Sequence, residues 1–189
     1  MESEASDVRR WTTATVHPDM WTDPAEDPRE RDAVEGADER AALLEALRYF
    51  RLTLELKCEG LDAEQLARRS VPPSTMSLLG LIRHMAEDER HFRRLAGGDL
   101  PRIYRTADDR EADWDGAVAD PEVVAEARRR WKEEAGATDR FLAAAPDLGA
   151  PLPDGGRLRE LLAMQVTEYA RHCGHADLLR ERLDGRVGQ

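Results

Sequence analysis

TEYARHCGHAD, residues 167–177, lies late in the last long stretch of helical periodicity in this chain. At about 100° per residue, an α-helix places Glu168, His172 and His175 on a single face. Leucine side chains border that face, so the three polar side chains point toward an interior where each needs a partner. A metal ion would supply one, and the fold that brings other ligands to this face is therefore the first question.

Apolar residues recur at helical spacing in four long segments. Asp38, Ser77 and Asp120 are candidate N-caps, the last followed by a proline at the first helical position. The segments predicted as helices are residues 38–58, 77–95, 120–146 and 157–183, with a short helical turn at 61–66. This pattern predicts an all-α fold, a four-helix bundle in which a long connection, residues 99–120, joins helices two and three.

The first 36 residues differ from the rest of the chain. They are rich in Pro, Thr, Asp and Glu, and their few large apolar side chains cannot form a core. Tryptophans in such a segment favour contact with the domain or with a partner, because their apolar area would otherwise be exposed. We expect a partly ordered, extended N-terminal arm over residues 1–36 and a metal-binding bundle domain over residues 37–185.

Charge and composition exclude several classes of function. The net charge is −11, from 28 Lys and Arg against 39 Asp and Glu, and no basic stripe is present. Nucleic-acid binding is therefore not expected. No apolar run reaches the ~20 residues of a membrane span, and the N-terminus lacks the layout of a signal peptide. With only two cysteines, which predict no disulfide framework, the sequence indicates a cytoplasmic protein without membrane partners.

The second predicted helix carries a histidine among its apolar positions. His84 follows Leu-Ile-Arg, and Asp88 and His91 come one and two turns later on nearly the same face. Bundles build metal sites from facing helices, and His84, Glu168 and His172 would together offer two imidazoles and one carboxylate with open coordination positions. Such a set suits zinc, nickel or iron.

Each of these residues also has an interpretation without metal. Glu168 would pair with Arg171 or Arg83 at the surface, and His172 would be a hydrogen-bonded core histidine. His175 would brace a ligand or lie at a helix end, and His91 would be exposed. In that case the polar face is a buried hydrogen-bond network in an interaction module, and His84 lies beyond the reach of His172.

Two segments resemble the signature segments of the DinB-like superfamily. They are SLLGLIRHMAEDERHF, residues 77–92, and EYARHCGHADLLRE, residues 168–181. Within the superfamily they are most similar to an uncharacterised actinobacterial branch near the mycothiol-dependent maleylpyruvate isomerases. The resemblance implies a four-helix bundle that holds a divalent metal through His84, Glu168 and His172. His175 stands where many members have glutamine, so it either joins the ligands or braces them, and Asp88 and His91 are further candidates.

The resemblance also implies a function. Members of known activity use a low-molecular-weight thiol such as mycothiol as cosubstrate, and a metal favours the thiolate at neutral pH. We therefore expect S-transfer to, or isomerisation of, a small electrophile, with Glu168 and His172 as catalytic residues and zinc as the first choice of metal. Arg83, Arg171 and Tyr104 are candidates for binding an anionic substrate. The alternative is a non-catalytic, stress-related metal-binding bundle acting as a homodimer.

Overall fold

The computed structural model describes residues 8–10, 27–30 and 38–187. These residues form six α-helices, and within these ranges there is no strand. The helices are α1 (Glu39–Lys57), α2 (Ala63–Ala67), α3 (Leu78–Leu95), α4 (Ala112–Asp115), α5 (Pro121–Ala144) and α6 (Leu158–Asp184). The prediction of an all-α fold with four long helices is confirmed.

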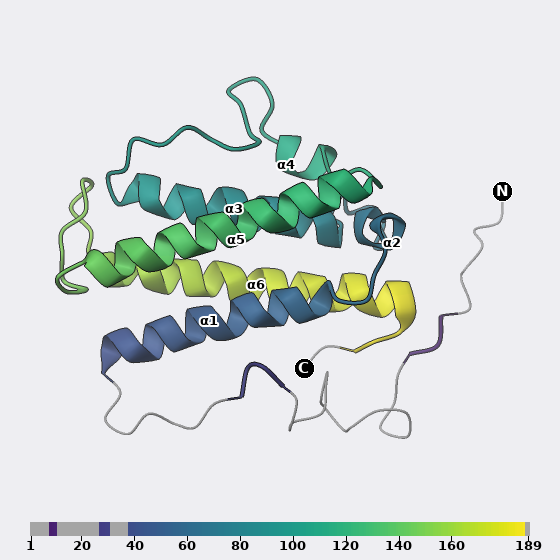
Figure 1. The fold of residues 1–189 in the computed structure, drawn as a ribbon, viewed down its shortest axis with the longest axis horizontal. Coiled ribbons are helices and arrows are strands. Elements are labelled where there is room, and N and C mark those ends of the chain that lie inside the picture. Colours follow the sequence, from purple (N-terminus) through teal and green to yellow (C-terminus); the bar gives the residue numbers. More distant parts are fainter. Residues whose placement is uncertain (1–7, 11–26, 31–37, 188–189) are drawn as a thin grey trace.

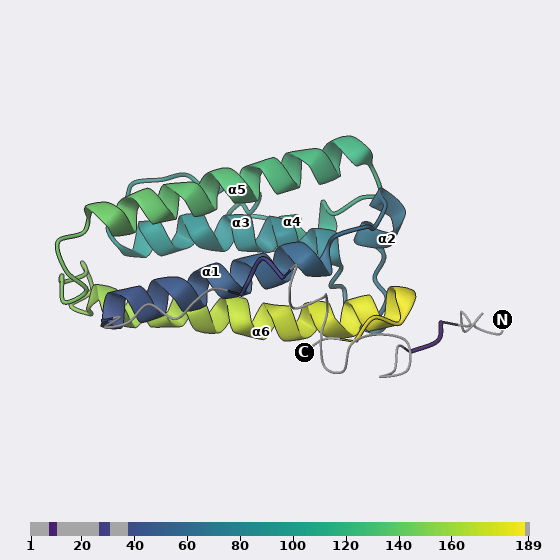
Figure 2. The ribbon, with the colours of Figure 1, turned by 60° about the horizontal axis from the view of Figure 1, so that its bottom comes forward.

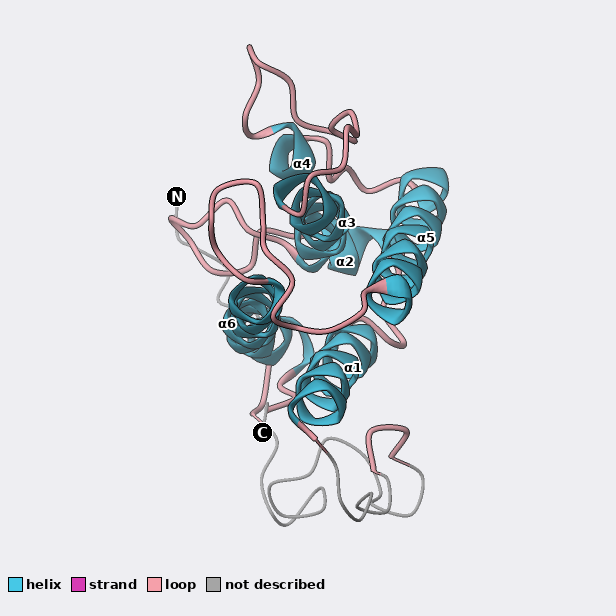
Figure 3. Cartoon of the chain, turned by 90° about the vertical axis from the view of Figure 1, so that its left-hand side faces the viewer, coloured by secondary structure: helices cyan, strands magenta, loops and turns pink. Residues whose placement is uncertain are grey.

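The four long helices run side by side along the long axis of the molecule (Figures 1 and 2). Viewed end-on, they stand at the corners of a four-sided bundle (Figure 3). Helix α3 packs on α5 and on α6, and α1 packs on α6. The core between them is mainly leucine, including the fully buried Leu54, Leu81 and Leu162.

The helix ends follow the predicted signals. Asp38 accepts a hydrogen bond from the backbone N–H of Ala41 at 2.9 Å, and Ser77 accepts one from Gly80 at 3.0 Å. Both side chains satisfy donors that the first helical turn leaves unpaired. At the other end, Gly185 closes α6 with a φ of 83°, a left-handed conformation that glycine adopts without steric cost.

One polar network joins the four long helices inside the core. Arg51 of α1 donates to Glu89 of α3 at 2.8 Å, and Tyr169 of α6 donates its hydroxyl to the same carboxylate at 2.6 Å. Trp131 of α5 donates to the Tyr169 oxygen at 2.7 Å. Glu89 and Tyr169 are fully buried, so these bonds fix the rotation and register of α3 against α6.

The connection between α3 and α5 contains one feature that the sequence pattern did not predict. The short helix α4 forms within it and packs on the side of α3 away from α1 (Figures 1 and 3). The connection is therefore anchored to the bundle.

Most of the predicted N-terminal arm, residues 1–36, lies outside the described residues. Within the described part, Arg10 pairs with Glu181 of α6 at 2.9 Å. Asp27 and Arg29 form a buried ion pair, and Arg48 of α1 donates to the Arg29 carbonyl at 2.6 Å. These contacts place the described fragments against α1 and α6, and the domain limits stay a prediction. Among the described helices, none is long and apolar enough to cross a membrane.

Candidate metal centre

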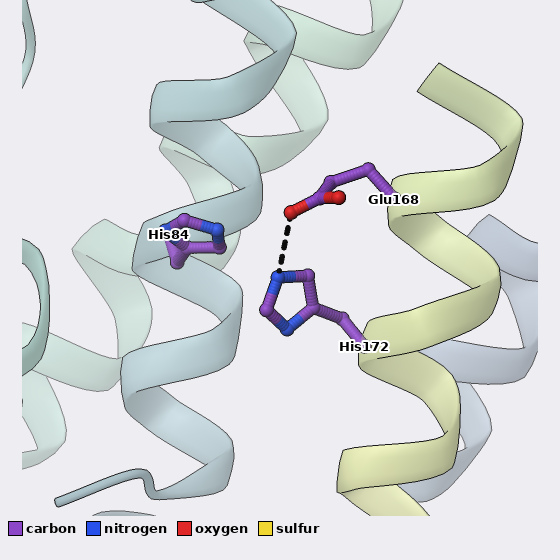
Figure 4. A group of neighbouring side chains, drawn as sticks. All are labelled: His84, Glu168 and His172. Atoms are coloured by element: carbon purple, nitrogen blue, oxygen red, sulfur yellow. Dashed lines mark hydrogen bonds and ion pairs between the residues drawn. The ribbon is translucent and has the colours of Figure 1, made fainter. Parts of the chain in front are cut away.

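Three potential ligands from two helices converge inside the bundle. His84 lies on α3, and Glu168 and His172 lie one turn apart on α6, with their side chains directed toward α3 (Figure 4). One ligand atom from each residue lies within 4.8 Å of the other two. The His84 and His172 ring centroids are 4.6 Å apart. The alternative in which His84 lies beyond the reach of His172 is therefore wrong.

The donor set fits a divalent transition metal. Two ligand atoms bound to one zinc ion at about 2.1 Å lie at most about 4.2 Å apart, so an inward movement of less than about 1 Å would complete the site. At present the His172 Nε2 atom lies 3.2 Å from Glu168 Oε1. A cation between these two atoms would replace that hydrogen bond.

His172 is held in the form that a metal requires. Its side chain is 9% exposed, and burial lowers its pKa to about 4, with the neighbouring His84 acting in the same direction. The Glu168 carboxylate opposes this shift but does not cancel it. The imidazole is therefore neutral near pH 7, and a neutral ring keeps a lone pair for coordination.

His175 lies behind His172. The Nδ1 atoms of the two rings are 3.2 Å apart, so one ring donates and the other accepts. His175 is not one of the three residues whose ligand atoms converge. The contact is compatible with the bracing alternative for His175, whose role toward a metal stays a prediction.

Asp88 and His91 occupy different environments. Asp88 is largely buried one turn after His84, and its Oδ2 atom has no hydrogen-bond partner. Burial raises the pKa of Asp88 to about 6. His91 is exposed, and neither residue belongs to the converging group.

The three residues predicted to bind an anion all have partners within the protein. Arg83 donates to the carbonyl oxygens of Asp113 and Ala112, at 2.8 and 3.0 Å, and its guanidinium lies 3.9 Å from the Tyr104 ring centroid. Tyr104 donates its hydroxyl to Glu126 at 2.9 Å. Arg83 and Tyr104 thus hold the connection between α3 and α5, and their role toward a substrate stays a prediction.

Arg171, the third of these residues, pairs with Glu168 as the interpretation without metal proposed. Its Nη1 atom lies 2.8 Å from Glu168 Oε2, and the Arg171 side chain is 59% exposed. The pair engages one carboxylate oxygen and leaves the other directed at His172. Surface pairing and convergence on the candidate metal centre therefore occur together.

Helix α4 adds side chains that sequence reasoning missed. Asp113 is fully buried, and its Oδ2 atom lies 2.9 Å from His84 Nδ1 and 2.7 Å from Arg105 Nη2. Burial alone would raise the Asp113 pKa, but hydrogen bonds from His84 and Arg105 hold it below its ordinary value. Trp114 stacks on the His84 ring, with centroids 4.7 Å apart and planes at 22°. The only sequence signal for this contribution is the pair Asp113-Trp114 within an acidic stretch.

Fold and site together define a class: a four-helix bundle with two histidines and one glutamate converging between its second and fourth long helices. A family model described as mycothiol-S-transferase matches residues 42–185. The match covers more than half of the chain, so the chain belongs to this family, which confirms the resemblance to DinB-like proteins.

A solved structure shares the fold. The chain is similar to a conserved protein of Enterococcus faecalis, with a TM-score of 0.50 and 14% sequence identity over 78% of this chain and 95% of the other. At that identity the similarity extends to the fold alone. No curated protein sequence matches the chain.

Proposed function

We propose that the protein is a divalent-metal-dependent enzyme that activates a low-molecular-weight thiol, mycothiol or a close analogue, for S-transfer to or isomerisation of a small electrophile. Family membership supports the thiol as cosubstrate. The convergence of His84, Glu168 and His172 within 4.8 Å is the observation that carries the metal.

His84, Glu168 and His172 would hold the metal. A divalent cation bound there would act as a Lewis acid that lowers the pKa of a bound thiol, so that thiolate forms at neutral pH. Zinc is our first choice, with nickel and iron as alternatives, because imidazole with carboxylate suits all three.

The protein side chains set the conditions of that chemistry. Glu168 contributes one negative charge, and Arg171 holds its Oε2 atom at 2.8 Å, which orients Oε1 toward the site. Burial of His172 excludes water and keeps the ring neutral. His175 braces the far side of His172 through the contact between their Nδ1 atoms.

The connection between α3 and α5 favours an enzyme over a non-catalytic metal-binding bundle. If the connection served only to contact a second subunit, its side chains would not be expected to touch the metal ligands on the long helices. Here Asp113 and Trp114 both contact His84, so the connection forms part of the site. A homodimer remains compatible with this proposal, as do the cytoplasmic location and the lack of nucleic-acid partners expected from the sequence.

The direct test is elemental analysis of protein purified without a histidine tag, together with thiol-dependent consumption of an electrophile. His172→Ala should lose most of the metal and the turnover. Thr167→Ala, an exposed substitution next to Glu168 on the same helix, is the matched control and should retain both. Metal-free wild-type protein without thiol-dependent turnover, and a His172→Ala variant indistinguishable from it, would refute the proposal.

A further inference from the structure

The hydrogen bond between Asp113 and His84 decides which ring nitrogen carries the proton. A neutral imidazole has one N–H, and an ionised carboxylate only accepts hydrogen bonds. With Asp113 Oδ2 at 2.9 Å from His84 Nδ1, the proton belongs on Nδ1. Arg105 Nη2 also lies 3.0 Å from Nδ1, but an unprotonated Nδ1 would hold its lone pair against the Asp113 carboxylate oxygen, and Arg105 already donates to that carboxylate at 2.7 Å. In the neutral ring that a metal requires, the lone pair of His84 is therefore on Nε2.

Several contacts keep the Asp113 carboxylate beside His84 Nδ1. Arg83 holds the backbone of α4 through the carbonyls of Ala112 and Asp113. The Trp114 ring covers the His84 ring, and its Cε3 atom would lie only 2.8 Å from a Cβ at Gly80. Trp114 thus packs closely on α3 at both His84 and Gly80, which limits the orientations open to the His84 ring.

We propose that Asp113 is a positioning residue of the metal centre, which fixes the tautomer and direction of His84 from a helix outside the four-helix bundle. This inference rests on the proposed metal-dependent function. Ligating histidines commonly donate their second N–H to a carboxylate, which orients the ring and strengthens its other nitrogen as a donor. The Nδ1 atom of His172 faces the His175 ring at 3.2 Å, whereas the Nδ1 atom of His84 faces the Asp113 carboxylate at 2.9 Å.

The test compares zinc affinity in four proteins, measured by competition with a chromophoric chelator after metal removal. Asp113→Asn should weaken zinc binding by about 10–100-fold, the usual effect of losing such a partner. Arg105→Gln breaks the same ion pair but leaves the His84 acceptor in place, so it should retain much more affinity. Asp115→Asn, the same change in the same short helix at an exposed ion pair with Arg69, should bind zinc like the wild type.

A second measurement reports the tautomer without any metal. Imidazole ¹⁵N NMR of the metal-free wild-type protein should show protonated Nδ1 and unprotonated Nε2 at His84, the signal that disappears in His84→Gln. In Asp113→Asn that preference should weaken. The wild-type result needs no variant to fold beyond the one used for assignment, and circular dichroism checks the folding of each variant.

The outcomes separate this inference from the proposed function. Wild-type protein that binds neither zinc nor nickel nor iron would refute the metal proposal, while the tautomer still tests the role of Asp113. Equal losses of zinc affinity in Asp113→Asn and Arg105→Gln would mean that the ion pair merely anchors α4, and that would overturn the positioning role. A wild-type His84 protonated at Nε2 would overturn it as well.

Discussion

Asp88→Asn should stabilise the metal-free protein at neutral and alkaline pH. Asp88 lies one turn beyond His84, and its buried Oδ2 atom has no hydrogen-bond partner. Burial raises the pKa of Asp88 from 3.8 to about 6; His84 and the side-chain amide of Gln165 oppose this rise, and Glu89 and Glu168 add to it. An asparagine of the same shape removes the charge that the site disfavours.

The magnitude and its pH dependence follow from linkage. Because the folded-state pKa is raised, the native state holds the proton more tightly than the unfolded state does. The stability that the bound proton of Asp88 contributes is complete below pH 3.8 and is lost as pH rises toward 6. At about 1.36 kcal/mol per pKa unit the loss above pH 6 is about 3 kcal/mol, an upper value for the gain in Asp88→Asn. At pH 4.5 the same relation gives a loss of only about 1 kcal/mol, so the gain in Asp88→Asn should fall to about that value.

Urea unfolding in the presence of a chelator, at pH 8 and at pH 4.5, measures both quantities. Asp99→Asn, which removes one exposed carboxylate just beyond α3, controls for the general effect of lowering the negative charge. A gain of the same size at both pH values would contradict the reasoning, as would destabilisation of Asp88→Asn at pH 8. A confirmed gain would mean that the protein keeps a destabilising carboxylate beside the candidate ligands, as functional sites commonly do.

Two further predictions concern the core. Tyr169→Phe should lower the free energy of unfolding by roughly 1–3 kcal/mol, because it leaves the Trp131 N–H without its acceptor and removes one of the donors to Glu89; an unchanged urea midpoint would contradict this. Burial raises the pKa of Cys58 and of Cys173 to about 12, so a thiol reagent at pH 8 should modify neither in the native protein and both after unfolding. Rapid modification of the native protein would show that at least one thiol is accessible.

The fold could be predicted because its signals are local. Asp38 and Ser77 each cap a helix by accepting a hydrogen bond from its first turn. Gly185 ends α6 by adopting the left-handed conformation directly after the last helical residue. The pairing of Glu168 with His172 is local too, since one helical turn separates them. Only the proximity of His84 to this pair depended on tertiary structure, and it followed from the assumption that the second and fourth long helices face each other in a bundle.

The rest of the site could not be predicted because its signals are not periodic. Asp113 lies in a four-residue helix within an irregular connection, where no hydrophobic repeat places it against α3. Arg83, a candidate for binding an anionic substrate, also donates to the backbone of that helix, because a buried guanidinium needs acceptors and two carbonyls are within reach. No pattern in the sequence marks Glu89 as buried, although it is fully buried and its carboxylate accepts hydrogen bonds from Arg51 and Tyr169.

The buried network and the candidate metal centre are coupled by their positions in the sequence. Glu89 directly follows Asp88, and Tyr169 directly follows Glu168, so each network residue is about 100° around its helix from a residue beside the site. The bonds of Tyr169 with Glu89 and Trp131 therefore set the rotation of α6 relative to α3, which in turn sets the direction in which Glu168 and His172 point. The bundle core thus orients two of the proposed ligands, whereas α4 orients the third, His84, from outside. Substitutions in the network and in α4 would accordingly disturb different ligands of the same ion.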